Sequence, residues 1–183
     1  MTKMTQPFVA GPLASSDAVT LELMQPVARF SLRARGGAVA ALGTALDLTL
    51  PEKIGTRANK GKTEVLCLGP DEWHVLAAES DAAGIVKACA DVYADAPHSL
   101  TEVSDREVTV RITGPKAAEV LTLGCPRDID GISVGSGRRT IFDGATVLLW
   151  RDGDTEFRMD IWRSFVPHVV SLLETGTVEL AGE

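Results

Sequence analysis

Residues 99–126, SLTEVSDREVTVRITGPKAAEVLTLGCP, decide the fold of this chain. The VTVRIT segment alternates apolar and polar residues, which is the two-residue period of a half-buried strand. Gly114 and Pro115 then turn the chain, because glycine tolerates unusual dihedrals and proline at a first helical position loses no hydrogen bond. Apolar residues next recur at spacings of three and four. The stretch therefore predicts a strand, a tight turn and a helix that ends by Gly124.

The same device occurs earlier in the chain, which indicates an internal repeat. An alternating strand precedes Gly36, just as one precedes Gly114, and an apolar helical face follows it. The segment WHVL, beginning at Trp73, is echoed by FRMD, which begins at Phe157. A repeat of about 80 residues is too long for a solenoid unit. We therefore expect two copies of one α+β module that face each other.

These elements predict an α+β fold built from two similar halves of antiparallel sheet covered by helices. We divide the chain into an extended N-terminal arm at 1–26, a first half at 27–104 and a second half at 105–183, with the two halves forming one compact domain. The arm contains proline, glycine and serine without a sustained period, so we expect it to be extended or loosely ordered. A polar segment at 53–62 predicts a mobile loop.

Composition favours a globular protein with a protein partner. The chain has 183 residues, a formal net charge of −7, 45% hydrophobic residues and a mean hydropathy of +0.10. The slight apolar excess suggests a surface covered by a partner, whereas the acidic balance repels a polyanion, so we expect no nucleic-acid binding and no membrane attachment. The sequence shows neither a signal-peptide core nor an apolar run of membrane-spanning length, and we expect a cytoplasmic protein.

Residue types that often carry chemistry have no motif spacing here, so we predict no catalytic, cofactor-binding or metal-binding residue. Cysteines without a C-x-x-C pair argue against a disulfide framework or zinc site and are predicted to be buried thiols. Ser104 and Asp105 predict a turn or helix-like cap rather than part of a triad. The glycine-rich segment 131–137 lacks a P-loop ending and predicts a hairpin loop. The thiols are Cys67, Cys89 and Cys125, and the histidines, which have no ligand spacing, are His74, His98 and His168.

An arginine-rich segment and nearby tryptophans are the candidates for protein contact. Six arginines and no lysine lie between residues 127 and 163. Forked guanidinium contacts suit an interface, although solvated pairing with neighbouring aspartates explains the arginines equally well. Most tryptophans on strands belong to a core, but one beside an arginine can anchor a partner. The candidate interface residues are Arg139, Trp162 and Arg163, expected to act in fold and assembly.

Several stretches together resemble the gamma subunits of bacterial heterotetrameric sarcosine oxidase. The combination of GCPRD, RT-F and WRSF is quite specific, and the similar stretches cover roughly residues 60–175. They are LGPDEWHVL at 68–76, VTVRITGPKAAEVLTLGCPRDID at 108–130, RRTIF at 138–142, VLLWR at 147–151 and FRMDIWRSFVPHV at 157–169.

More remotely, EVSDR followed by a strand and ITGPKAAEVL is similar to the start of folate-dependent aminomethyltransferases of the glycine-cleavage T-protein type. That family has a catalytic aspartate in a strand approached through Gly-Gly and paired acids. The matching stretch here is DGATVL at 143–148, with apolar or hydroxyl residues where the acids would stand. This resemblance implies an aminomethyltransferase-like folate-binding-domain fold that is retained for assembly.

The resemblance implies a complex that oxidatively demethylates sarcosine to glycine, with hydrogen peroxide as a product and transfer of the one-carbon unit to tetrahydrofolate. It places flavins, NAD and tetrahydrofolate on the large subunits and zinc on the smallest, and gives this chain no cofactor. The implied partners are the alpha, beta and delta subunits, and the implied role is that of a non-catalytic structural subunit. A free-standing folate-binding or aminomethyltransferase-like protein is the alternative, although the K-G-C-x-x-G-Q signature of a related family is not found.

Overall fold

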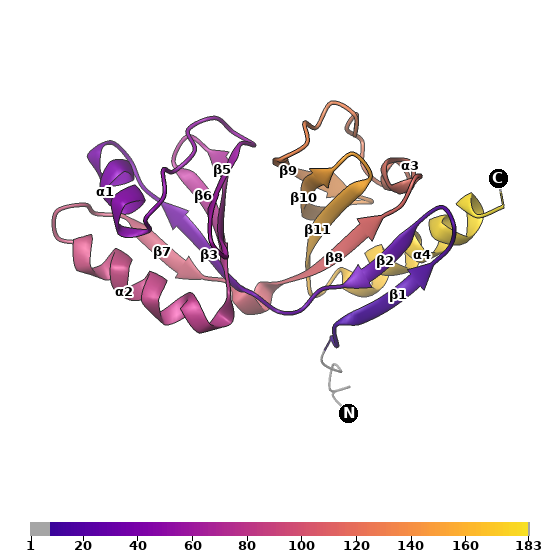
Figure 1. The fold of residues 1–183 in the computed structure, drawn as a ribbon, viewed down its shortest axis with the longest axis horizontal. Helices are drawn as coiled ribbons and strands as arrows, with labels where there is room; N and C mark the ends of the chain where they lie inside the picture. Colours follow the sequence, from indigo (N-terminus) through magenta and orange to yellow (C-terminus); the bar gives the residue numbers. More distant parts are fainter. Residues whose placement is uncertain (1–7, 183) are drawn as a thin grey trace.

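A computed structural model describes residues 8–182 of the protein. Two antiparallel sheets lie at the middle of the molecule, and helices cover the outer face of each sheet (Figure 1). The predicted α+β class, with two halves of antiparallel sheet covered by helices, is confirmed. No helix among residues 8–182 is both long enough and apolar enough to cross a membrane.

The first sheet has the strand order β4-β5-β6-β3-β7 and packs against two helices. The chain enters it at β3, turns at Gly36 into α1, and returns through three further strands to α2 and β7. The bounds are β3 Ala28–Arg33, α1 Gly37–Ala45, β4 Arg57–Lys60, β5 Thr63–Gly69, β6 Glu72–Ala77, α2 Ala82–Val92 and β7 Ser99–Glu102, with a 3-10 turn at Glu79–Asp81.

The second sheet has the order β1-β2-β8-β11-β10-β9 and also carries two helices. The stretch that opened the sequence analysis forms β8, the turn at Gly114 and the short helix α3, as predicted. The bounds are β1 Gly11–Ser15, β2 Thr20–Leu23, β8 Glu107–Thr113, α3 Ala117–Leu121, β9 Ser136–Phe142, β10 Ala145–Gly153, β11 Glu156–Trp162 and α4 Val166–Leu180.

Both sheets have the same strand order, but the strand that precedes each half in the sequence pairs into the sheet of the other half. The order β4-β5-β6-β3-β7 matches β9-β10-β11-β8-β2, so β7 and β2 hold equivalent places. Strand β7 precedes the second half in sequence and completes the first sheet, whereas β2 precedes the first half and lies in the second sheet. The chain therefore passes between the halves twice, at residues 24–27 and 103–106 (Figure 1).

Each sheet has an apolar face under its helices and a more polar face toward the other sheet. In β11 the alternating residues Phe157, Met159 and Ile161 are fully buried in the helix-side core, as the strand period predicts. The residues between them point toward the first sheet. A third, small apolar cluster of Leu66, Leu76 and Trp150 lies between the sheets. The two halves thus share an interface that is only partly apolar.

The sequence predicts an extended or loosely ordered N-terminal arm at residues 1–26. In the structure the segment 11–23 forms the hairpin β1–β2, whose strands are extended, and β2 pairs with β8, a pairing that was not predicted. Leu21 and Leu23 are buried, so these short strands are stabilised by the sheet they join rather than by a long period of their own. Residues 1–7 of the arm lie outside the described residues. The division into halves at 27–104 and 105–183 stays a proposal.

Other local predictions have mixed outcomes. Cys67, Cys89 and Cys125 are buried, as predicted. Residues 104–106 form a 3-10 turn, which agrees with the predicted helix-like cap. The predicted loop at 53–62 is wrong in part, because residues 57–60 form β4 by pairing with β5. The short strand β7 was not predicted, because its four residues are mostly exposed and carry no apolar alternation.

Gly36 and Gly114 hold equivalent turns, yet only Gly114 is closely packed. A Cβ atom at Gly114 would lie 2.4 Å from the Ala18 carbonyl oxygen, whereas a Cβ at Gly36 meets nothing within 4 Å. Both residues have a positive φ. We expect Gly114→Ala to cost about 3 kcal/mol or more, because backbone strain of 1–2 kcal/mol adds to a forced shift of the β1–β2 hairpin.

Gly36→Ala is the matched control, with an expected cost of about 1–2 kcal/mol from strain alone. Chemical denaturation of both variants measures the difference. Equal losses would contradict the close packing of the β1–β2 hairpin on the Gly114 turn.

Candidate functional site

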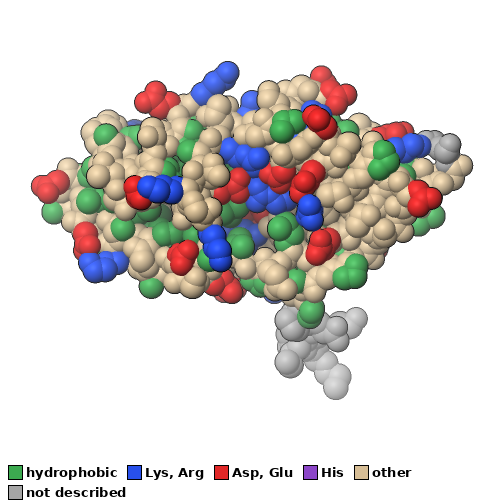
Figure 2. Space-filling model, viewed as in Figure 1, with side chains coloured by type: hydrophobic (Ala, Val, Ile, Leu, Met, Phe, Trp, Pro, Cys, Tyr) green, Lys and Arg blue, Asp and Glu red, His purple; other side chains and the backbone are tan. Residues whose placement is uncertain are grey.

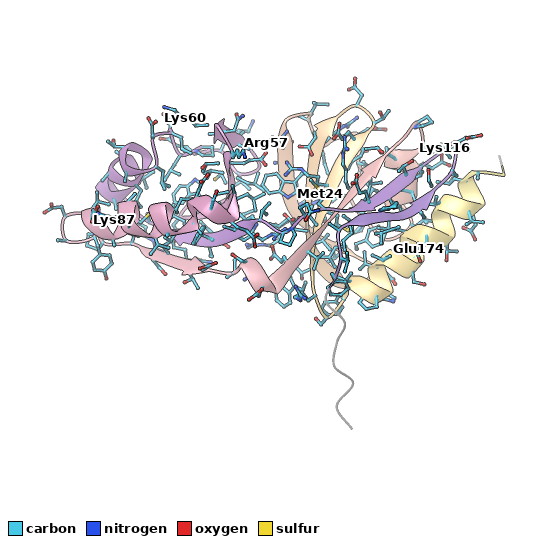
Figure 3. All side chains as sticks on the ribbon, turned by 60° about the horizontal axis from the view of Figure 1, so that its bottom comes forward. Met24, Arg57, Lys60, Lys87, Lys116 and Glu174 are labelled. Atoms are coloured by element: carbon cyan, nitrogen blue, oxygen red, sulfur yellow. The ribbon has the colours of Figure 1, made fainter. Side chains whose placement is uncertain are left out.

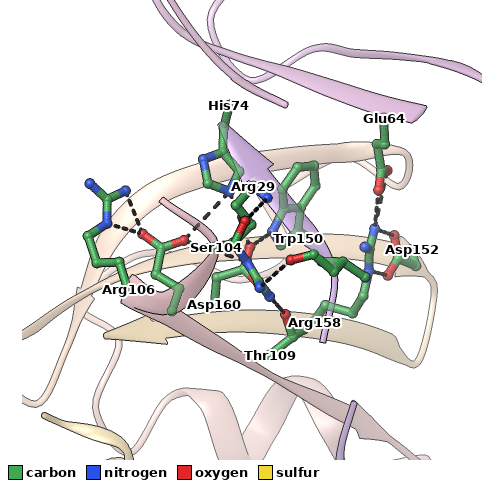
Figure 4. Close-up of polar contacts among 12 residues, drawn as sticks. Arg29, Glu64, His74, Ser104, Arg106, Thr109, Trp150, Asp152, Arg158 and Asp160 are labelled. Carbon is green, nitrogen blue, oxygen red and sulfur yellow. Dashed lines mark hydrogen bonds and ion pairs between the residues drawn. The ribbon is translucent and has the colours of Figure 1, made fainter. Parts of the chain in front are cut away.

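Charged and polar side chains are buried between the two sheets (Figure 4). Each is at most 7% exposed, although none belongs to the helix-side cores. They come from β3 and β6 in the first half and from β8, β10 and β11 in the second. We call them the central cluster: Arg29, His74, Glu107, Thr109, Trp150 and Asp160.

Asp160 accepts hydrogen bonds from both halves of the molecule. Its Oδ2 accepts from the Trp150 indole Nε1 at 2.7 Å, and its Oδ1 accepts from the Thr109 hydroxyl and from Arg29 Nη2, the latter at 3.3 Å. Arg29 also donates to Thr109 Oγ1 and to the Val27 carbonyl. The carboxylate of the second half is therefore neutralised by the guanidinium of the first, which a buried charge requires.

Glu107 and His74 lie beside this pair with unused hydrogen-bonding capacity. Glu107 Oε2 is 3.6 Å from His74 Nε2 and 4.0 Å from Arg29 Nε, and none of these three buried atoms has a hydrogen-bond partner. The other oxygen of Glu107 accepts from Arg106 Nη2 at 2.8 Å. Glu107 thus draws its charge compensation from a partly exposed arginine at the rim of the cluster.

Burial and charge set the protonation states in the cluster. Burial lowers the pKa of His74 below its usual value, against the opposing pull of Asp160 and Glu107, so the imidazole is neutral near pH 7. Burial alone would raise the pKa of Asp160. The charge of Arg29 and the hydrogen bonds from Thr109 and Trp150 outweigh it and hold that pKa below its usual value.

His74, Glu107 and Asp160 also have the chemistry of a metal-ligand set. One ligand atom from each lies within 4.8 Å of the other two. However, both Asp160 oxygens already accept hydrogen bonds, and the guanidinium of Arg29 lies where a metal ion would experience its repulsion. The cluster therefore contains its own cation, and its geometry favours a structural ion pair over a metal centre.

A second group of four charges joins the sheets at the surface. Arg158 donates to Asp152 Oδ2 at 2.6 Å and to Glu64 Oε2 at 3.0 Å, and Arg57 donates to Glu64 Oε1 at 2.9 Å. Both guanidinium groups lie over the Trp150 ring, 5.0 Å and 6.0 Å from its centroid. Basic and acidic side chains gather over this junction in Figure 2, and Arg57 lies between the halves in Figure 3.

The structure brings two of the three predicted interface residues together. Arg139 and Trp162 line a pocket of about 240 Å³ that reaches Glu107 and Asp160. Arg139 is not free, because it pairs with Glu72 of the first half. Trp162 is 41% exposed, and the Arg106 guanidinium lies 5.6 Å from its ring centroid.

Arg163 does not line this pocket but a neighbouring one of about 170 Å³, which also reaches Arg29, Glu107 and Thr109, and its guanidinium is 5.2 Å from the Phe8 ring. His98 and His168 have no contact with the central cluster: His98 bonds the Ala96 carbonyl, and His168 bonds Asp143 at the turn before β10. Asp143 therefore lies at an exposed hairpin, and the 143–148 stretch supplies no buried acid. An interface role for Arg139, Trp162 and Arg163 stays a proposal.

Comparison with curated relatives decides the family. No protein-family model matches the chain. A sarcosine oxidase subunit gamma from Corynebacterium sp. strain U-96 is 34% identical over 169 residues, covering 90% of this chain and 82% of that protein. A sarcosine oxidase subunit gamma from Arthrobacter sp. is 30% identical over 173 residues, covering 92% of this chain and 84% of that protein. The chain belongs to the family of sarcosine oxidase gamma subunits.

Solved structures support the gamma-subunit assignment. A chain in the structure of heterotetrameric sarcosine oxidase from Corynebacterium sp. U-96, in complex with pyrrole 2-carboxylate, is 31% identical with a TM-score of 0.83, covering 93% of this chain and 89% of that chain. Aminomethyltransferase T of the glycine cleavage system from Bartonella henselae is 16% identical with a TM-score of 0.68. The match covers 86% of this chain and 46% of that chain, and at this identity it shows that the fold is shared and nothing beyond the fold. Both predicted resemblances are confirmed.

Sequence reasoning missed most of the central cluster of this gamma-subunit chain. Arg29 and Glu107 were not singled out, and His74 was set aside for lack of ligand spacing. Arg29 stands between buried Ala28 and Phe30, and Asp160 between buried Met159 and Ile161. The same alternation of charged and apolar residues is typical of a strand with one solvent-facing side, so the sequence carries no signal that distinguishes these two residues from exposed ones.

Loss of the Asp160 charge is expected to be strongly destabilising. Asp160→Asn removes the nearer carboxylate and leaves the buried Arg29 guanidinium with Glu107, 4.0 Å from its Nε, as its counter-charge, so we expect a loss of about 3 kcal/mol in the free energy of unfolding. Asp143→Asn, at an exposed turn, is the control, with an expected change below about 1 kcal/mol. The double variant Arg29→Met/Asp160→Asn should recover part of the loss. A loss below about 1 kcal/mol in the single variant would refute the pairing.

The stability of the chain should fall on acidification because of His74 and Asp160. Both side chains have a pKa in the folded chain that is below the pKa in the unfolded chain. The unfolded values are about 6.5 for histidine and about 3.9 for aspartate. The contribution of each group to stability is complete above its unfolded pKa and is lost as the pH falls toward its folded pKa. The slope is at most about 1.4 kcal/mol per pH unit for each proton. His74→Gln should flatten the slope between about pH 6.5 and 5 relative to the unsubstituted chain. Denaturation at a series of pH values measures the slopes, and an unchanged slope in His74→Gln would contradict the assignment.

Proposed function

We propose that this chain is the non-catalytic, structural gamma subunit of a heterotetrameric sarcosine oxidase. The observation that carries the proposal is the match to a chain of that complex over 93% of this chain at a TM-score of 0.83. The agreement extends along almost the whole fold rather than along one motif. Two curated relatives named sarcosine oxidase subunit gamma also match, and each alignment covers about nine tenths of this chain.

In this proposal the complex oxidatively demethylates sarcosine to glycine, forms hydrogen peroxide and passes the one-carbon unit to tetrahydrofolate. The alpha, beta and delta subunits are the partners, and they hold the flavins, NAD, tetrahydrofolate and zinc. The complex works in the cytoplasm. This chain contributes packing surface that stabilises the large subunits.

The chemistry of the central cluster supports a non-catalytic role. A general acid or base must reach the proton that it transfers. Asp160 is 1% exposed and both of its oxygens accept hydrogen bonds within the chain. Its partners tie one half to the other, so its charge serves cohesion between the halves.

The exposed face around Trp162 is the proposed contact with a large subunit. The corner between β11 and α4 contains Trp162, Arg163 and Phe165. Trp162 is 41% exposed and Phe165 is 39% exposed. Exposed aromatic rings beside arginines are typical of residues that dominate binding energy. Arg139 lies on the same pocket as Trp162 and holds the first half against it.

Co-expression with the large subunits tests this function. The isolated chain should be colourless and should not oxidise sarcosine, whereas the co-expressed chain should co-purify with them. Trp162→Ala should weaken assembly by about 2 kcal/mol or more. The unfolding free energy of the isolated chain should change by less than the loss of about 3–5 kcal/mol that is typical when a core tryptophan is truncated. Arg163→Lys should also weaken assembly, because lysine lacks the forked donors.

Val178→Ala, at an exposed position of α4, is the control. Sarcosine turnover per bound flavin should be unchanged in whatever complex forms. Normal assembly with lost turnover per flavin would place Trp162 or Arg163 in an active site and overturn the structural role. Micromolar binding of tetrahydrofolate by the isolated chain would favour the free-standing alternative.

A further inference from the structure

The outer edge of β7 has unpaired backbone groups. This strand pairs with β3 on one side and is the last strand of its sheet. Val103 N–H donates to the Arg29 carbonyl, and antiparallel pairing alternates, so Ser99 and Thr101 also face β3. The N–H and C=O groups of Leu100 and Glu102 therefore point away from the sheet. Three of the four β7 residues are exposed.

The other sheet edges within residues 8–182 carry protective features that β7 lacks. Strand β1 contains Pro12 and a bulge, which weaken pairing with a further strand. Strand β4 carries Arg57 and Lys60, and charged side chains on an edge have the same effect. Strand β9 meets the first half through the bridge between Thr56 and Ser136. Strand β7, with the sequence SLTE, is short and carries the charge of Glu102, but it has no proline, no bulge and no basic residue.

The repeat shows what kind of structure covers this edge. Strand β2 occupies in the second sheet the place that β7 occupies in the first, and its outer edge is paired with β1 in antiparallel fashion. Helix α4 packs over β1 as well as β2. Within residues 8–182 the first half has no counterpart of β1, so the equivalent position beside β7 and under α2 is open.

Helix α2 exposes the apolar residues that this missing strand would cover. Val86 and Tyr93, at α2 and its C-terminal end, are 45% and 55% exposed and line a groove of about 670 Å³ with Leu100 of β7. The repeat that relates Trp73 to Phe157 gives them counterparts in α4, namely Val170, which packs against the core, and Thr177, which is 1% exposed. The difference in exposure at equivalent helix positions matches the absence of a covering strand.

We infer that an extended segment of another subunit of the complex pairs with β7 as an added antiparallel strand. This inference rests on the proposed function, and names one contact of the proposed subunit. Backbone hydrogen bonds to Leu100 and Glu102 supply affinity, and an apolar side chain of the segment fills the groove beside Tyr93. Glu102 lines the groove, and neither a lysine nor an arginine lies among the lining residues. A basic residue on the segment complements this carboxylate.

Amide hydrogen exchange of the chain, alone and in the co-expressed complex, tests the inference. The outward amides of Leu100 and Glu102 should exchange at least tenfold more slowly in the complex. The inward amides of Ser99 and Thr101 are the internal reference. A complex in which the outward amides exchange as in the isolated chain overturns this inference alone, whereas failure of any complex to form overturns the proposed function with it.

Variants give an independent measurement. Tyr93→Asp places a charge in the groove, and Leu100→Pro removes an outward N–H while keeping the bonds to β3. Each should weaken assembly at least tenfold, whereas Val178→Asp, a similar change on exposed α4, should not. The Tyr93 ring packs edge-on against His98 at the end of α2, so the unfolding free energy of isolated Tyr93→Asp is measured first. Normal assembly of the folded variant contradicts the inference. If the outward amides of the isolated chain exchange more slowly as the protein concentration rises, the occupant is a second copy of this chain, and the inference is overturned.

Discussion

A guanidinium enclosed between two sheets must have a carboxylate within reach, and here the two come from opposite halves. Arg29 belongs to the first sheet and Asp160 to the second, and both are almost fully buried. Separating the halves would expose apolar surface at Leu66 and Leu76 and would also break a charge pair that neither half can replace. This directional contact therefore sets the relative placement of the two sheets together with the small apolar cluster of Leu66, Leu76 and Trp150 beside it.

The same contact explains why the internal repeat is faint in sequence. Arg29 and Glu107 have the same separation along the chain as Gly36 and Gly114, so they occupy equivalent positions in the two halves. Equivalent residues of facing modules lie close together near the centre, where Arg29 Nε is 4.0 Å from Glu107 Oε2. Identical charges there would repel each other in a medium of low dielectric. The halves can share strand order and turn glycines, but at this position they must differ.

Sequence reasoning succeeds where the burial of one face of a strand or helix determines the pattern of its residues. Phe157, Met159 and Ile161 alternate because helices cover that face, and the turn at Gly114 follows from local backbone chemistry. The opposite face of the same strands carries charges whether water or a second sheet covers it. Arg29 and Asp160 therefore resemble solvent-facing residues, and only their three-dimensional neighbours reveal burial.

The pairing of β2 into the second sheet has a consequence for synthesis of the chain. Leu21 of β2 pairs with Ile112 of β8, so an early segment must wait for most of the first half to be made before its partner exists. At ribosomal speeds of roughly 5–20 residues per second, that delay is about 5–20 s. The first sheet, by contrast, is built from the uninterrupted segment 28–102 and can close as soon as β7 has emerged, so only the second sheet depends on two separate segments of the chain. During these seconds the apolar residues of β2 are exposed on the nascent chain, where a chaperone can bind them.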